Sequence, residues 1–262
     1  MATDVIDLRD FYQSPLGSAA CRLVRHRLRR IWPDVRGMRV LGLGYGTPYL
    51  HPFRAEAERV VAAMPSSQGV LHWPAKGPGL VALTDEADLP FPDNLFDRVL
   101  LAHALEVSDQ LRPMLREIWR VLADNGRLTL IVPNRRGIWA RIDSTPFGHG
   151  RPYTQTQLSR LLRDNMFMPE QSAAALFVPP SASRMALAAA PAWEKVGERW
   201  FRTFAGVVLV EASKQIYGAT AQPVRHRRPI FVSLPKGAAE GGGSAARAVP
   251  LNPCREGRFP GR

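Results

Sequence analysis

Apolar residues follow two alternating patterns along this chain, short continuous runs and stripes at helical spacing. The continuous runs predict buried strands over residues 38–43, 59–64, 97–103, 127–132 and 207–212, with a further strand within 167–178. The stripes predict helices over residues 16–31, 50–58, 110–122, 155–165 and 183–202, the last broken or kinked near Pro191. Residues 68–84 are rich in Gly and Pro, and their pattern predicts no element. Strands that alternate with helices favour an α/β fold with a doubly wound, mostly parallel sheet.

The first predicted strand runs into a glycine-rich turn, in the sequence VLGLGYGTPYL. Gly42, Gly44 and Gly46 lack a Cβ atom, which lets the backbone bend sharply and approach a ligand closely. In a doubly wound sheet, ligands bind beyond the carboxyl ends of the strands, where this turn would lie. The dinucleotide pattern G-x-G-x-x-G is not matched, because Thr47 or Tyr49 occupies its last position. The turn therefore predicts a ligand site without identifying the ligand.

Two later segments narrow the choice of ligand. They are DLPFPDNLFDRVLLAHALE, residues 88–106, and LREIWRVLADNGRLTLIVPN, residues 115–134. In order and content they resemble the class I S-adenosylmethionine-dependent methyltransferases, and within these the type 11 branch. The resemblance covers roughly residues 38–135. It implies a Rossmann-like methyltransferase sheet with an antiparallel last strand, an N-terminal helical extension and an insertion between the last two strands.

The same resemblance implies S-adenosyl-L-methionine as cofactor and methyl transfer as activity, and we expect a small-molecule acceptor. It places Gly44 and Gly46 beneath the methionine part of the cofactor, and His103 near the sulfonium. Asp88 would accept a hydrogen bond from the adenine amino group, with Leu89 beside the ring. Two plainer roles are open: Asp88 can cap a turn, and His103 can be a core histidine. The complete implied cofactor set is Gly42, Gly44, Tyr45, Gly46, Met64, Asp88, Leu89 and His103.

Two of these positions depart from the family pattern. Gly42 and Met64 stand where the family usually has acidic residues, the second of which grips the ribose hydroxyls. Losing one charge-assisted hydrogen bond costs about 1.5–3 kcal/mol, or about 10- to 150-fold in affinity. Ser66, Ser67, Gln68 and His72 follow the second strand and are candidates to compensate at the ribose.

The loop after the fifth strand of the family pattern, NRRGIWARIDSTPFGHGRPY, is rich in aromatic and basic residues. His149 is our candidate catalytic base and Tyr153 a candidate for orienting the acceptor. Arg135 or Arg136 could clamp an anionic acceptor. The alternative is a surface loop held by aromatic packing. No metal site is predicted, since Cys21 and Cys254 are the only cysteines.

Aromatic residues also gather between the last two predicted strands, within residues 191–204. We expect Trp193, Trp200 and Phe201 to pack in the core. They could instead line an apolar acceptor pocket or form a face that touches a membrane.

The formal charge of +12 is carried mainly by arginine and favours solvated surfaces over a nucleic-acid partner. No apolar run approaches the ~20 residues of a transmembrane helix, and the N-terminus has no signal-peptide pattern. These features and the two cysteines suit the cytoplasm. We expect a methyltransferase-like domain over residues 1–234, with its cofactor half at about 37–135, and a disordered basic tail over 235–262. Alternative functions are a catalytically inactive, methyltransferase-like binding or regulatory protein and a nucleic-acid-associated protein.

Overall fold

The structure is a computed structural model that describes residues 4–181 and 183–216. Seven strands form one sheet in the order β3-β2-β1-β4-β5-β7-β6. The strands are β1 Arg39–Gly44, β2 Arg59–Pro65, β3 Val81–Thr84, β4 Phe96–Ala102, β5 Leu122–Pro133, β6 Phe167–Ala175 and β7 Val207–Lys214. β7 runs antiparallel to both β5 and β6, whereas the pairs among β1 to β5 are parallel. The predicted fold class, including the antiparallel last strand, is confirmed.

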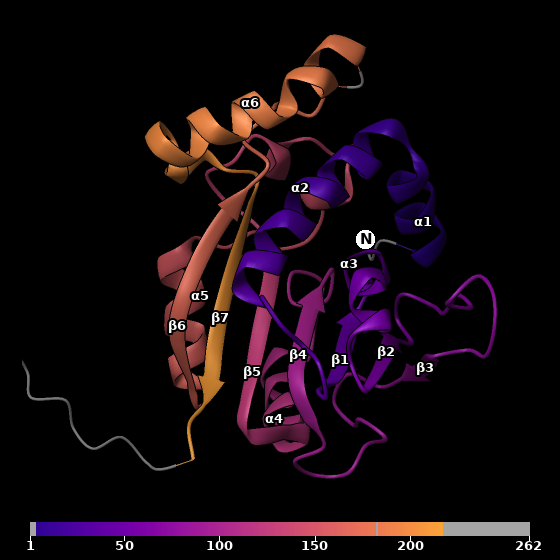
Figure 1. The fold of residues 1–262 in the computed structure, drawn as a ribbon. Helices are drawn as coiled ribbons and strands as arrows, with labels where there is room; N and C mark the ends of the chain where they lie inside the picture. The colour runs from indigo at the N-terminus through magenta and orange to yellow at the C-terminus, as the bar shows by residue number, and fades with distance from the viewer. Residues whose placement is uncertain (1–3, 182, 217–262) are drawn as a thin grey trace, which may run out of the picture. The chain divides into compact units, whose positions relative to one another are not determined.

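Helices cover both faces of the sheet (Figure 1). They are α1 Val5–Gln13, α2 Pro15–Ile31, the short α3 Thr47–Leu50, α4 Leu111–Val121, α5 Gln155–Asp164 and α6 Arg184–Trp200. In Figure 1, α2 lies on the near face and α4 and α5 lie on the far face, while α6 lies beyond the upper ends of the strands. Alternate residues of the strands supply two separate cores: Val40 belongs to the core beneath α1 and α2, and Leu41 to the core beneath α4 and α5.

Polar caps fix the paired N-terminal helices α1 and α2. The carboxylate of Asp4 accepts a hydrogen bond from the Ile6 amide at 2.8 Å and starts α1. Ser14 ends α1 and starts α2, since its hydroxyl accepts from the Gly17 amide at 3.0 Å. Pro15 then occupies the first turn of α2, where its missing N–H costs nothing. The joint at Ser14 fixes where α1 ends and α2 begins.

Several boundaries differ from the sequence prediction. α1 and β3 were not predicted, and α6 runs through position 191 without a break. The helix predicted over 50–58 is wrong: α3 gives way to a 3-10 turn at His51–Ala55, because Pro52 lacks the amide that a longer helix would use. β5 begins at Leu122, before the strand predicted over 127–132, and its register with β4 shifts between Phe96 and Arg98. The expected tail over 235–262, with Cys254, lies outside the described residues, and the domain limit at 234 stays a prediction.

The carboxyl ends of β1, β4, β5 and β6 meet along one edge of the sheet. Pro133 at the end of β5 and Ala175 at the end of β6 both pair with Val207 at the start of β7. α6 follows β6 and therefore begins at the same edge as the glycine turn. Within the described residues, none of the helices combines the length and apolar content that a membrane-crossing helix needs.

Candidate functional site

The glycine turn follows the carboxyl end of β1. Gly44 has φ +84°, a left-handed conformation that favours glycine. A Cβ atom there would lie 2.4 Å from the Ala102 carbonyl oxygen, so the close approach of β1 to β4 also requires a glycine. Gly46 precedes the first turn of α3, and Tyr45 lies buried between the two glycines. The predicted turn is thus formed, with its backbone at the edge where ligands bind in such sheets.

The two positions that lack the family's acids are packed with apolar side chains. A Cβ atom on Gly42 would lie 2.4 Å from Cδ1 of Leu50, so Leu50 fills the space of a larger residue. Met64 is fully buried in the core beneath α1 and α2. Neither position has a polar side chain to offer a ligand, and both positions are buried.

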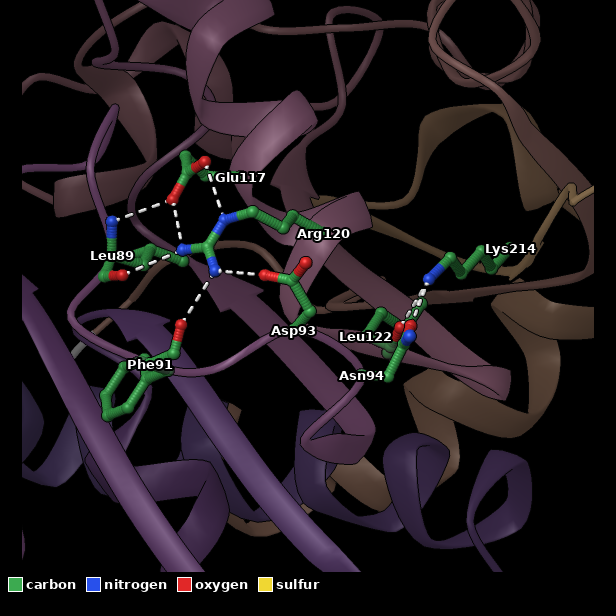
Figure 2. A network of polar contacts seen from close by, with 8 residues as sticks. All are labelled: Leu89, Phe91, Asp93, Asn94, Glu117, Arg120, Leu122 and Lys214. Atoms are coloured by element: carbon green, nitrogen blue, oxygen red, sulfur yellow. Dashed lines mark hydrogen bonds and ion pairs between the residues drawn. The ribbon is translucent and has the colours of Figure 1, made fainter.

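The segment with Asp88 and Leu89 is fastened to α4 by Arg120 (Figure 2). The guanidinium of Arg120 donates to the carbonyls of Leu89 and Phe91 at 2.9 and 2.8 Å. Glu117 accepts from Arg120 at 2.6 Å and from the Leu89 amide at 3.0 Å. These contacts join the two sequence segments that carried the resemblance. Leu89 is buried, and Asp88 remains exposed at the sheet edge, available to a ligand.

A chain of buried polar side chains starts at His103, just after β4. His103 has φ +54°, a conformation that L-residues rarely adopt outside turns and functional sites. Its Nε2 lies 2.7 Å from the hydroxyl of Tyr12, which in turn lies 2.5 Å from the hydroxyl of Tyr49. Burial and the neighbouring Tyr49 raise the pKa of Tyr12 well above its usual range, so this hydroxyl stays protonated. The single hydroxyl proton of Tyr12 can be donated to His103 or to Tyr49, and the tautomer of His103 decides between them.

Glu106 lies on the other side of the His103 ring. Its Oε1 is 3.4 Å from Nδ1 of His103, close enough for an ion-pair contact but without hydrogen-bond alignment. Both carboxylate oxygens are buried and have no hydrogen-bond partner among the described residues. A buried carboxylate that makes no hydrogen bond is costly, so both oxygens of Glu106 can accept a hydrogen bond from a ligand.

The helix α1 closes the site at this edge. The ring of Tyr12 stacks on Tyr45 with centroids 5.8 Å apart, beside the glycine turn. The Val5 amide donates to the Gln68 carbonyl at 2.9 Å, and the Gln68 side chain donates to the His103 carbonyl. Gln68, a candidate to replace the missing acid, thus already holds the backbone that follows β4.

The predicted catalytic residues lie in the loop that wraps around Glu106. The Arg151 amide donates to the Glu106 carbonyl at 2.7 Å, and a Cβ atom on Gly150 would lie 2.4 Å from the same oxygen. His149 is half-buried, and its ring makes no hydrogen bond among the described residues. Burial raises the pKa of Tyr153, which lines a surface cavity of about 590 Å³ with Arg135 and other residues. The cluster around His103 is more deeply buried than this pair.

Sequence reasoning did not single out Tyr12, Glu106 or Arg120. Tyr12 was detectable, because Val5, Leu8 and Tyr12 recur at helical spacing behind the cap residue Asp4. The importance of Glu106 depends on the left-handed turn at His103, which no local pattern reveals. Among the described residues, no cluster of His, Cys, Asp or Glu could hold a metal ion.

Comparison with known sequences places the chain among methyltransferases. A model of the family described as a methyltransferase domain matches residues 41–130. A demethylmenaquinone methyltransferase of Thermus thermophilus is 31% identical over 162 residues, which cover 58% of this chain and 73% of that protein. The corresponding enzyme of Corynebacterium efficiens is 32% identical over 130 residues, or 50% of this chain. The chain spans only 56% of that relative's length.

Solved structures agree on the fold. A Haloferax volcanii putative methyltransferase, solved in complex with the Trm112 methyltransferase activator, has a TM-score of 0.58 and 18% identity. The match covers 78% of this chain and 93% of that one. A possible histamine N-methyltransferase from Thermotoga maritima has a TM-score of 0.55 and 17% identity, with 80% and 96% of the two chains covered. At these identities the likeness concerns the fold alone.

Proposed function

Because the chain belongs to the class I S-adenosylmethionine-dependent methyltransferases, we propose that it methylates a small apolar acceptor of the demethylmenaquinone type. The observation that carries the proposal is the buried chain of Tyr12, His103 and Glu106 beside the glycine turn. Phe147 packs on the His103 ring at 5.1 Å, and Phe11 and Trp139 pack on Phe147. These aromatic side chains would suit a flat, apolar acceptor.

The residues present fit the methionine end of the cofactor. S-adenosylmethionine carries a sulfonium and an ammonium group, and the buried carboxylate of Glu106, which makes no hydrogen bond among the described residues, suits a cation. Gly44 and Gly46 would hold the methionine part, with Asp88 and Leu89 at the adenine. Gly42 and Met64 would contribute packing rather than a hydrogen bond.

The ribose of the cofactor needs other hydrogen-bonding groups in place of the acids that Gly42 and Met64 replace. Thr84, at the end of β3, has a buried hydroxyl without a hydrogen-bond partner among the described residues. It pairs in register with Pro65, next to the position of the missing acid. We propose Thr84 and Gln68 as the polar groups nearest the ribose.

In this proposal His103 removes the proton that the acceptor loses. When bound, the cofactor supplies an electrophilic methyl group. In the tautomer that this proposal requires, Nδ1 of His103 carries the ring proton toward Glu106, and Nε2 is the basic nitrogen. The acceptor would replace the Tyr12 hydroxyl at Nε2, and Glu106 would stabilise the imidazolium that forms. The buried aromatic side chains around the ring exclude water from this step.

A pair of matched histidine variants tests which residue is the base. We expect His103→Asn to lower kcat with a demethylmenaquinone analogue by about 10²- to 10⁴-fold, and His149→Asn to change it little. The opposite ranking would assign the base to His149. Calorimetry with S-adenosylhomocysteine should show binding to both variants. Absence of heat from the unmodified chain at high micromolar ligand would contradict the enzyme proposal and favour a binding or regulatory protein.

A further inference from the structure

α6 exposes a row of large apolar side chains, which we call the α6 stripe: Met185, Trp193, Val196 and Trp200. Their exposed fractions are 85%, 50%, 48% and 72%. Positions 193, 196 and 200 follow helical spacing and share one side of the helix, with position 185 about two turns earlier on the same side. Phe201 and Phe204 extend the apolar surface past the helix end, with 55% and 61% exposed. The expectation that Trp193, Trp200 and Phe201 pack in the core is therefore wrong.

The opposite side of α6 is firmly packed, so the stripe is not the inner side of a loose helix. Ala190, Glu194 and Gly197 are buried on that side. Glu194 accepts a hydrogen bond from the Phe177 amide at 2.7 Å. A Cβ atom on Gly197 would lie 2.2 Å from the Phe177 ring, so the helix approaches its neighbour as closely as glycine permits. These contacts turn the stripe away from the core.

The acidic and basic residues of α6 also lie on different sides of the helix. Its acidic residues Glu194 and Glu198 pair with Arg27 of α2, at 3.7 and 2.6 Å, and Arg30 adds a second contact to Glu198. Lys195 and Arg199 are exposed next to the stripe, and the Arg199 guanidinium lies 5.9 Å from the Trp200 ring. The outer surface of α6 is therefore apolar and basic, with its carboxylates neutralised on the inner side.

The stripe belongs to the helix that begins at the edge of the sheet where the proposed site lies. α6 begins after β6, whose end shares an edge with the carboxyl ends of β4 and β5 (Figure 1). The exposed residues Arg135 and Arg136 follow β5 directly and add positive charge at this edge. If this edge faced the lipid, an apolar acceptor dissolved in a membrane would meet the edge of the sheet that carries His103.

We propose that the α6 stripe docks the protein on the surface of a bilayer that contains anionic lipid. Tryptophan and phenylalanine beside lysine and arginine are the composition of helices that lie in the headgroup region. Large exposed apolar patches rarely occur without a binding partner. The route of the acceptor rests on the proposed function, but docking itself requires neither acceptor nor cofactor.

Vesicle flotation with the full chain tests the docking. We expect binding to vesicles of phosphatidylcholine with phosphatidylglycerol, and at least about tenfold weaker binding to phosphatidylcholine alone or at high salt. The double variant Trp193→Ser, Trp200→Ser should lose at least about tenfold in affinity. Leu83→Ser is the matched control, since Leu83 is 54% exposed on β3 at the other end of the sheet. Lys195→Glu with Arg199→Glu should remove the preference for anionic lipid.

Three results would overturn the inference. The first is no binding to either kind of vesicle, and the second is equal vesicle binding by the double variant and the unmodified chain. The third is a dimer in light scattering that the double variant abolishes, because that result would assign the stripe to contact with a second copy of the chain. Thermal unfolding of each variant checks that it folds. A chain that binds vesicles but not S-adenosylhomocysteine would contradict the proposed function and leave the docking intact.

Discussion

At the scale of single residues, Gly44 shows how tightly the candidate site is constrained. Gly44 and Gly37 both have positive φ, at +84° and +70°, so alanine is strained at either position. Only Gly44 faces a neighbour, because a Cβ atom on Gly37 has nothing within 4 Å. We expect Gly44→Ala to lower the free energy of unfolding by about 1–3 kcal/mol more than Gly37→Ala, measured by urea denaturation. Equal losses would mean that β1 and β4 can separate without cost.

Tyr45 gives a prediction about pH. Burial raises its pKa to about 12, against an ordinary value near 10. Between these values the folded chain keeps the proton and the unfolded chain loses it, so this contribution to stability is present below pH 10 and is lost as pH rises toward 12. Urea midpoints from pH 9 to 11.5 should fall more steeply for the unmodified chain than for Tyr45→Phe. Parallel curves would show that Tyr45 ionises as freely in the folded state as in the unfolded one.

Individual site residues could be predicted from the sequence only where a family pattern names them. Gly44, Gly46, Asp88 and His103 were placed in that way, and the structure brings the glycine turn and His103 together. The structure also explains the departure at Gly42, where Leu50 fills the space. That packing depends on a three-dimensional contact eight residues away, and the sequence pattern alone does not show it.

At the scale of elements, Arg120 links α4 to the segment that contains Asp88. We expect Arg120→Ala to cost about 1–2 kcal/mol of stability, because it leaves the Leu89 and Phe91 carbonyls without their donor. The loosened segment should also bind S-adenosylhomocysteine more weakly in calorimetry. Arg116→Ala is the matched control, since Arg116 is exposed on the same helix. Unchanged cofactor affinity in Arg120→Ala would contradict a positioning role for this arginine.

Some helices and strands could be predicted from the sequence and others could not, and the burial of their side chains explains the difference. β1, β2, β4 and β7 are buried and apolar, so their runs are visible in the sequence. β3 has four residues at the sheet edge with Leu83 exposed, and it follows a segment rich in Gly and Pro. α6 was predicted with the wrong side toward the core: its small and acidic residues face inward, and its tryptophans face outward.

At the scale of the whole molecule, the order and direction of the strands follow from the alternation of elements and from the family resemblance. The arrangement of side chains at the carboxyl edge of the sheet does not follow from either of these. α1 of the N-terminal extension, the loop after β2 and the loop around Glu106 are far apart in sequence and meet at His103. Their contacts are mainly single side chains such as Tyr12 and Gln68, which leave no periodic signal.

The closure of the site by α1 has a consequence for any measured affinity. If the cofactor binds only when Tyr12 leaves Tyr45 and His103, the apparent dissociation constant equals the intrinsic one divided by the fraction of open molecules. A molecule that is open about one hundredth of the time would bind about a hundredfold more weakly than its site allows. Weak binding would then report the rarity of the open state, and a substitution that frees α1 would tighten binding without touching the ligand.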